Sequence, residues 1–174
     1  MVKRVCSILN TILLIILLAI ACLLIVPSLI GYKSFAVISG SMEPNIHVGS
    51  IVYAKETPFD ELQIGDVISY RISEDTMVTH RIQEINTDDS TVITKGDAND
   101  SEDSSPVSAN NIVGKVALSI PLIGYISIYA KTPIGIAAIC GVVAVIIILN
   151  YLPEVLEHDD DETKDKKEKN RSKV

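Results

Sequence analysis

Two long apolar runs lie near the ends of the chain and enclose a stretch of shorter, alternating segments. Residues 12–26 are fifteen apolar residues in succession, and with their flanks they form a run from Val5 to Ile30. The second run, residues 134–149, contains no charged residue. Because a helix needs roughly 20 apolar residues to cross a hydrocarbon core, both runs predict transmembrane helices.

The first run has an alternative interpretation as a cleaved signal peptide. Lys3 and Arg4 form a basic segment before it, and the small residues 19–22, AIAC, resemble a cleavage or lipidation site. However, LLIV follows immediately, so the apolar run continues past any cut at that point. We therefore interpret it as an uncleaved membrane helix.

Between the two runs, short segments rich in Val, Ile, Thr and Tyr alternate with turn signals such as Ile64-Gly65-Asp66. Helical periodicity is weak there, so this pattern predicts a small, mainly β domain. The expected strands cover residues 35–39, 50–56, 66–72, 77–85, 90–96 and 111–120.

The pattern divides the chain into four parts. These are an N-terminal stub and membrane helix at residues 1–31, a β-rich domain at 32–131, a C-terminal membrane helix at 132–152, and a tail at 153–174. The tail is charged, low-complexity sequence and is expected to be disordered.

Basic residues predict the orientation in the membrane. Lys3 and Arg4 precede the first helix, and four lysines follow the second one, namely Lys164, Lys166, Lys167 and Lys169. Both termini are therefore expected in the cytoplasm, with the β-rich domain outside. The chain is predicted to be a cell-membrane protein with two spans.

Charge and cysteine content exclude several classes of function. Residues 32–131 contain 14 acidic and 7 basic residues, whereas nucleic-acid binding requires a basic surface. The three cysteines, Cys6, Cys22 and Cys140, lie in or beside the apolar runs. The sequence therefore has neither a disulfide framework nor a thiolate metal site in the outer domain.

One serine cluster is a candidate for nucleophilic chemistry. Ser41 lies in the turn-prone sequence SGSMEP, about ten residues after the first membrane run, hence at most about 33 Å from the bilayer. A serine hydroxyl needs a base within hydrogen-bonding reach. The outer domain offers His80, on an expected strand, and His47, six residues after Ser41. A solvated turn serine and surface histidines are the simpler alternatives.

An acidic loop supplies possible partners for the histidine. The segment TKGDANDSED contains Asp97, Asp100, Glu102 and Asp103. A carboxylate that accepts a hydrogen bond from imidazole Nδ1–H fixes the tautomer of the base. The alternatives are a solvated loop or a loose cation site, although the spacing does not match an EF-hand.

In this order, the motifs SGSMEP, GDVISYRI, VTHRI and TKGDAND resemble those of the type I signal peptidases. The histidine resembles the base of the archaeal and endoplasmic-reticulum kind of this family, which also occurs in some Gram-positive bacteria. The bacterial kind has a lysine as the base at this position. The similarity covers about residues 35–116. It implies the family's β-rich peptidase fold for the outer domain.

The resemblance also implies roles for individual residues. Ser41 matches the nucleophile, and Ser39 matches a position whose hydroxyl helps to form the oxyanion hole together with the Ser41 N–H. His80 matches the general base. Asp97 and Asp103 match two acidic positions associated with catalysis; we prefer Asp103 as the residue that orients His80 and Asp97 as a structural support.

The function implied is that of a membrane-bound serine endopeptidase that removes signal peptides from exported preproteins. Its partners would be signal peptides, the lipid bilayer and the protein-export translocon, and its chemistry needs no cofactor or metal. Small side chains are expected at the −1 and −3 substrate positions, with pockets not assigned among Val37, Ile38, Ile51 and Val52. Two alternatives remain: a non-catalytic, membrane-tethered module that holds exported substrates for another enzyme, and a self-cleaving protease of the repressor type, which would need a lysine base.

Overall fold

The computed structural model describes residues 2–74, 76–130 and 132–151. The named elements are α1 (Val2–Leu29), β1 (Tyr32–Ala36), β2 (Ile51–Lys55), β3 (Val67–Arg71), β4 (Met77–Asn86), β5 (Thr91–Lys95), β6 (Val107–Ser108), β7 (Ile112–Ile120) and α2 (Ile123–Tyr129). Short 3₁₀ turns lie at Phe59–Glu61 and Ala109–Asn111. The predicted tail, residues 153–174, lies outside the described residues.

The chain forms two units. The first comprises the described residues of Met1–Cys22 and Pro133–Val174, and the second is Leu23–Thr132. Two helices, Lys3–Leu29 and Pro133–Tyr151, are long and apolar enough to cross a membrane. Within the first unit, the side chain of Asn10 donates a hydrogen bond to Asn150 Oδ1 at 3.3 Å.

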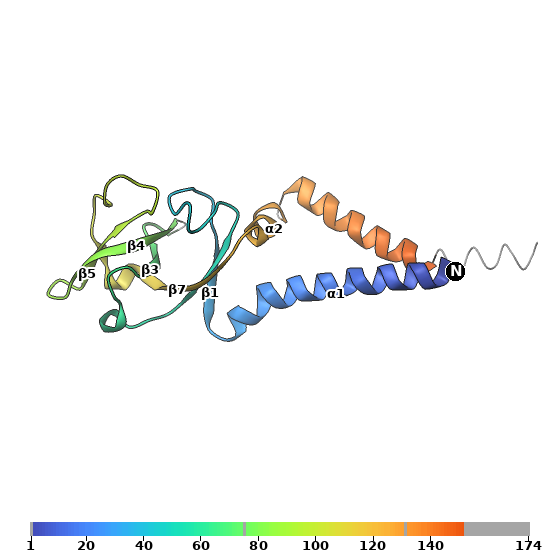
Figure 1. Ribbon diagram of the computed structural model, residues 1–174, viewed down its shortest axis with the longest axis horizontal. Helices are drawn as coiled ribbons and strands as arrows, with labels where there is room; N and C mark the ends of the chain where they lie inside the picture. Colours follow the sequence, from blue (N-terminus) through green and yellow to red (C-terminus); the bar gives the residue numbers. More distant parts are fainter. Residues whose placement is uncertain (1, 75, 131, 152–174) are drawn as a thin grey trace, which may run out of the picture. The chain divides into compact units, whose positions relative to one another are not determined.

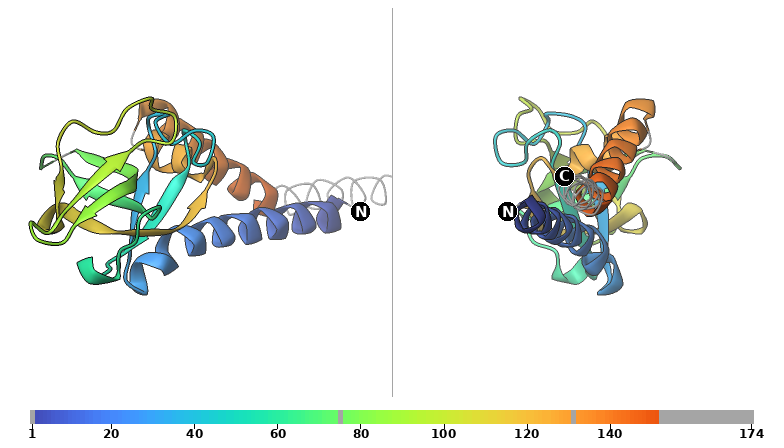
Figure 2. Two further views of the ribbon diagram at one scale, coloured as in Figure 1. Left: turned by 60° about the vertical axis from the view of Figure 1, so that its left-hand side comes forward. Right: turned by 90° about the vertical axis from the view of Figure 1, so that its right-hand side faces the viewer.

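The second unit is built on one antiparallel sheet (Figures 1 and 2). Its seven strands have the order β1-β2-β7-β3-β4-β5-β6, so β1 and β6 are the edge strands. Two clusters of buried side chains form the core, one around Ile68 and Ile82 and the other around Met42 and Val52. The prediction of a mainly β domain with an apolar helix toward each end is confirmed in this respect.

The strand predictions differ from the structure at two places. The sequence predicts residues 35–39 as the first strand, but β1 is Tyr32–Ala36 and pairs with β2 from Tyr32 opposite Lys55. Pairing starts early because α1 ends at Leu29 and Gly31, with φ of 92°, turns the chain directly into the sheet. The two-residue strand β6 was not predicted, because Val107–Ser108 is too short to show alternation.

The end of α1 is attached to the sheet by a side chain. Pro27 lies inside the helix and has no N–H, so the carbonyl of Leu23 lacks the hydrogen bond that a residue four positions later normally provides. The hydroxyl of Tyr53, on β2, donates to this carbonyl at 2.7 Å. The sheet unit therefore satisfies a polar group that the proline leaves unpaired.

Candidate functional site

The Ser41 loop is anchored in the core by its own neighbours. Met42 and Ile46 are buried beside Val52 of β2, and the Ile46 N–H donates to the Met42 carbonyl at 2.8 Å. Because Met42 points into the core, the adjacent Ser41 is held in a fixed turn at the sheet surface. The apolar residue after the serine is thus what positions this loop.

Ser41 and His80 come together on one cavity of about 250 Å³. The cavity wall runs from the end of β1, residues 35–38, to the beginning of β4, residues 77–80. Ser39 also lines it, and its Oγ lies 3.4 Å from Ser41 Oγ. Among the residues that line this cavity, all within the described part of the chain, there is no lysine.

His80 is held rigidly on β4. It is 8% exposed and pairs in register with the fully buried Ile68 of β3. Its Nδ1 lies 2.7 Å from Asp103 Oδ2. Nε2 is therefore the ring nitrogen that remains for a group in the cavity, the arrangement that a general base requires.

Asp103 Oδ2 accepts hydrogen bonds from three side chains at once. Besides His80, the hydroxyl of Tyr70 lies at 2.9 Å and the hydroxyl of Thr94 at 2.6 Å. Burial raises the pKa of Asp103, but the hydrogen bonds from His80, Thr94 and Tyr70 outweigh burial and hold this pKa below its ordinary value. The site therefore keeps an ionised carboxylate against the imidazole.

Tyr70 is a permanent donor in this cluster. Burial, together with the neighbouring Asp103 carboxylate, raises the pKa of Tyr70 to about 12, although a hydrogen bond from Thr94 acts in the opposite direction. The phenol is consequently protonated at neutral pH. Its ring also contacts His80 edge-on, with centroids 6.4 Å apart.

Asp97 has different contacts. It accepts two hydrogen bonds from Arg81, at 2.8 Å from Nε and 2.7 Å from Nη2, and a third from the Asn45 amide at 2.8 Å. The hydrogen bonds from Arg81 are the main reason that the pKa of Asp97 is lowered, against a smaller effect of burial. Asp97 thus links the serine loop, through Asn45, to the strand that carries His80.

The loop with Asp97 also touches the backbone of the serine loop. The Ala98 N–H donates to the Ser41 carbonyl at 2.8 Å. A Cβ on Gly96 would lie 2.6 Å from the same carbonyl oxygen, closer than real contacts allow. The two loops lie close together (Figures 1 and 2), and glycine at position 96 permits their approach.

Other sequence candidates lie outside this cluster. His47 does not line the cavity; its Nδ1 is 2.5 Å from Glu43 Oε2, and this hydrogen bond is the main reason that the pKa of Glu43 is lowered. Asp100 offers its backbone carbonyl to Lys95 Nζ at 3.2 Å. Of the possible pocket residues, Val37 and Ile38 line the cavity, whereas Ile51 and Val52 are buried in the sheet. Within the described ranges, no group of three or more His, Cys, Asp or Glu could hold a metal ion.

Four polar residues of the site were missed by sequence reasoning: Asn45, Tyr70, Arg81 and Thr94. Tyr70 and Thr94 each lie two positions after an apolar residue of an expected strand, Ile68 and Val92, and so share its face. Both are buried in the structure. A polar side chain in a strand's buried position needs a partner, and this was the available signal. Asn45 lies in a turn, where exposed polar residues are common, and Arg81 lies half-buried within β4, so neither gave a comparable signal.

Similarity to known proteins extends beyond the motifs. The chain is 45% identical over 89 residues to signal peptidase I W of Bacillus subtilis, covering 49% of this chain and 47% of that relative. It is 27% identical over 125 residues to the signal peptidase complex catalytic subunit SEC11 of Fusarium vanettenii, covering 65% and 73%. For SEC11C of Homo sapiens the values are 25% over 120 residues, covering 60% and 62%.

No protein-family model matches the chain. The chain spans about half the length of the Bacillus relative and less than three quarters of the other two. The relatives nevertheless include both a bacterial signal peptidase I and catalytic subunits of eukaryotic signal peptidase complexes. The resemblance to type I signal peptidases is therefore confirmed.

Proposed function

We propose that this relative of the type I signal peptidases is a membrane-bound serine endopeptidase that removes signal peptides from exported preproteins. The observation that carries the proposal is that Ser41 and His80 line one cavity while Asp103 holds His80 Nδ1. A module that only holds substrates has no need of this arrangement. A repressor-type protease needs a lysine base, whereas the residue that lines the cavity beside Ser41 is His80.

The catalytic roles follow from the hydrogen bonds. Ser41 Oγ attacks the carbonyl carbon of the residue before the cleavage site, and His80 Nε2 takes the proton. His80 then donates the proton to the leaving amine, and the same histidine activates a water that hydrolyses the acyl-enzyme. Asp103 fixes the imidazole orientation and stabilises the imidazolium. Asp97 acts as a support for the two loops.

The negative oxygen of the intermediate needs donors beside Ser41. The Ser39 hydroxyl, 3.4 Å from Ser41 Oγ, is one candidate. The Ser41 N–H is the other, since no described hydrogen bond within residues 2–151 uses it. A donor of this kind contributes about 3 kcal/mol to transition-state stabilisation.

The substrate suits the position of Ser41 in the chain. A signal peptide keeps its apolar segment in the bilayer and exposes its cleavage site just outside. Ser41 lies twelve positions after the last residue of α1, which limits its separation from the end of this helix to about 40 Å. We infer that the sheet unit is extracytoplasmic, that both termini are cytoplasmic, and that the translocon delivers the substrate.

The test is cleavage of a panel of preproteins by membranes that contain equal amounts of wild-type or variant protein. Ser41→Ala should lower kcat by roughly 10⁴-fold or more, because the acyl-enzyme cannot form. His80→Gln should have a comparable effect. Ser101→Ala and His47→Gln, at positions outside the cavity, are the matched controls and should retain activity.

Each result has a definite meaning. Cleavage after a small residue that depends on Ser41 and His80 supports the serine peptidase. Activity that survives Ser41→Ala contradicts the assigned nucleophile. A wild-type protein that binds preproteins and cleaves none of them supports the non-catalytic module.

A further inference from the structure

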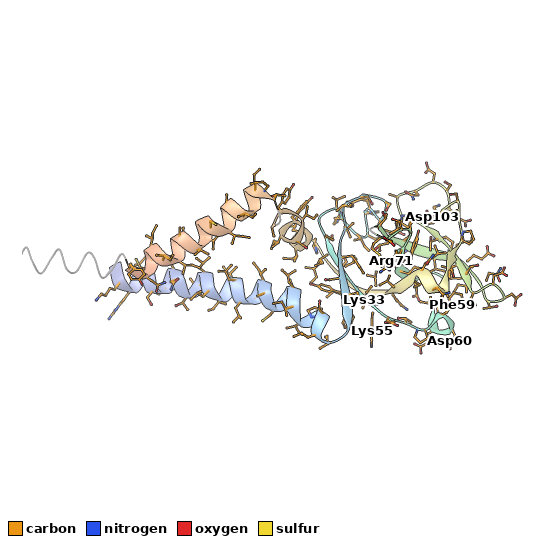
Figure 3. All side chains as sticks on the ribbon, turned by 180° about the vertical axis from the view of Figure 1, so that it is seen from behind. Lys33, Lys55, Phe59, Asp60, Arg71 and Asp103 are labelled. Carbon is orange, nitrogen blue, oxygen red and sulfur yellow. The ribbon has the colours of Figure 1, made fainter. Side chains whose placement is uncertain are left out.

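A second cavity, of about 430 Å³, is lined by both His80 and Asp103. Its wall includes Tyr70, Ile72, Val78, His80, Asp103 and Pro106. Arg71 and Asp103, which both line it, are labelled in Figure 3. Ser41 does not line this cavity, so the mechanism above leaves it without a use.

The two cavities share part of their wall at His80. Val78 and His80 line both of them. These residues are two positions apart on β4, so their side chains lie on the same face of the sheet. Tyr70, which pairs with Val78, continues this face on β3. A peptide that passes His80 therefore meets the wall of the second cavity.

Proton transfer decides which part of the substrate lies there. The signal peptide is the acyl part, and it becomes bonded to Ser41. The leaving amine belongs to the first residue of the mature protein and must approach His80 to receive its proton. The acyl part occupies the Ser41 cavity, so the mature part continues beyond His80.

Resting on the proposed function, we propose that the second cavity binds the first residues of the mature protein as an extended peptide. Its wall combines apolar side chains, among them Ile72, Val78 and Pro106, with polar groups from Arg71, Ser104, Ser105 and Asn111. It therefore suits an extended peptide whose backbone needs hydrogen-bonding partners.

The strand register gives the length of this subsite. Ile72 lies opposite Thr76, whose carbonyl accepts the Ile72 N–H at 3.0 Å. Thr76 directly precedes β4 and is four positions from His80. Four residues of a strand span about 13 Å. An extended substrate should consequently bring the third to fifth mature residues near Ile72.

Charge exchange at Ile72 tests this placement. Ile72 is 64% exposed, so Ile72→Lys and Ile72→Glu should preserve the fold. Ile64 is similarly exposed, at 67%, and lies before β3, whereas Ile72 lies directly after this strand. Ile64→Lys and Ile64→Glu are therefore matched controls at the opposite end of β3. The substrates are one preprotein with Glu or Lys at mature positions three to five.

The measured quantity is the ratio of kcat/KM for the Glu substrate to that for the Lys substrate, at low salt. Ile72→Lys should raise the ratio roughly threefold and Ile72→Glu should lower it by a similar factor, as expected for exposed charge pairs. The Ile64 variants should leave it within about twofold of the wild-type value, since they are remote from the peptide. The same charges placed five residues before the cleavage site should give no such dependence.

Failure of the inference can be distinguished from failure of the proposed function. Equal effects at Ile64 and Ile72, no effect at either, or a larger effect from charges before the cleavage site would overturn the subsite while cleavage persists. If the wild-type protein cleaves no preprotein, both proposals fall. A ratio that follows the charge at Ile72 alone supports the subsite.

Discussion

The Asp103 carboxylate illustrates how single residues set the chemistry of the site. One of its oxygens accepts hydrogen bonds from His80, Tyr70 and Thr94, within 2.6 to 2.9 Å. The two hydroxyls hold in place the same oxygen that accepts from the imidazole. Tyr70 and Thr94 are therefore positioning residues, which act on His80 through Asp103.

Removing either hydroxyl should slow catalysis without weakening substrate binding. We expect Tyr70→Phe and Thr94→Val each to lower kcat about tenfold, because a hydrogen bond to a charged group is lost, and to leave KM unchanged. Preprotein cleavage kinetics measure this, with Tyr32→Phe as the control. A rise in KM at constant kcat would show that these hydroxyls serve substrate binding instead.

At this scale the sequence pointed to Ser41, His80 and Asp103, whose catalytic roles stay predictions, but not to their supports. The motifs and their order single out these three residues, and the structure brings Ser41 and His80 to one cavity with Asp103 against His80. Tyr70 contacts Asp103 across 33 positions and Asn45 contacts Asp97 across 52, and separations of this size depend on how the strands pair. A single sequence does not determine that pairing.

Among the elements, the contact between the serine loop and the Asp97 loop leaves no room for a side chain at one position. Gly96 lies against the Ser41 carbonyl, and a Cβ there would meet this backbone oxygen and the side chain of Asn99. By contrast, a Cβ on Gly40, within SGS itself, would lie 3.5 Å from Glu43 Cγ, an ordinary contact. The glycine required at this site is thus the one in KGD.

This contrast gives a stability prediction. Gly96→Ala should destabilise the protein by about 2 kcal/mol, because one of the two loops has to move. Its Tm should fall by roughly 10 °C. Gly40→Ala should leave the Tm of the purified protein nearly unchanged. Equal losses for the two variants would contradict the steric account.

The elements themselves were largely predictable from alternation. Five of the six expected strands overlap their observed counterparts closely, because β-branched residues alternate clearly there. β1 begins three residues early, since its start is determined by the end of α1 at Leu29. The assignment of residues 32–131 to one extracytoplasmic domain stays a prediction.

For the whole molecule, two carboxylates with lowered pKa values predict sensitivity to acid. The pKa values of Asp97 and Asp103 lie below the ordinary value in the folded protein. Their contribution to stability is therefore present above about pH 4, where the unfolded carboxylates ionise, and is lost as pH falls through the lowered values.

The corresponding measurement is the Tm of the full chain in detergent between pH 7 and pH 3. The wild-type Tm should fall below about pH 4. Asp97→Asn should lower the Tm at pH 7, since a hydrogen bond to a charged group is worth about 2 kcal/mol, and should reduce the fall at low pH. An Asp97→Asn curve parallel to the wild-type curve would contradict this role of Asp97.

The hydrogen bond from the Tyr53 hydroxyl to the Leu23 carbonyl has a consequence for the evolution of the sequence. Proline at position 27 creates the need for a donor, and the Tyr53 hydroxyl meets it. Loss of the hydroxyl alone leaves a carbonyl unpaired, whereas loss of both restores an ordinary helical bond. Selection should therefore act on the two positions as a pair: descendants that keep the proline retain a hydroxyl on β2, and lineages that replace the proline become free to accept phenylalanine there.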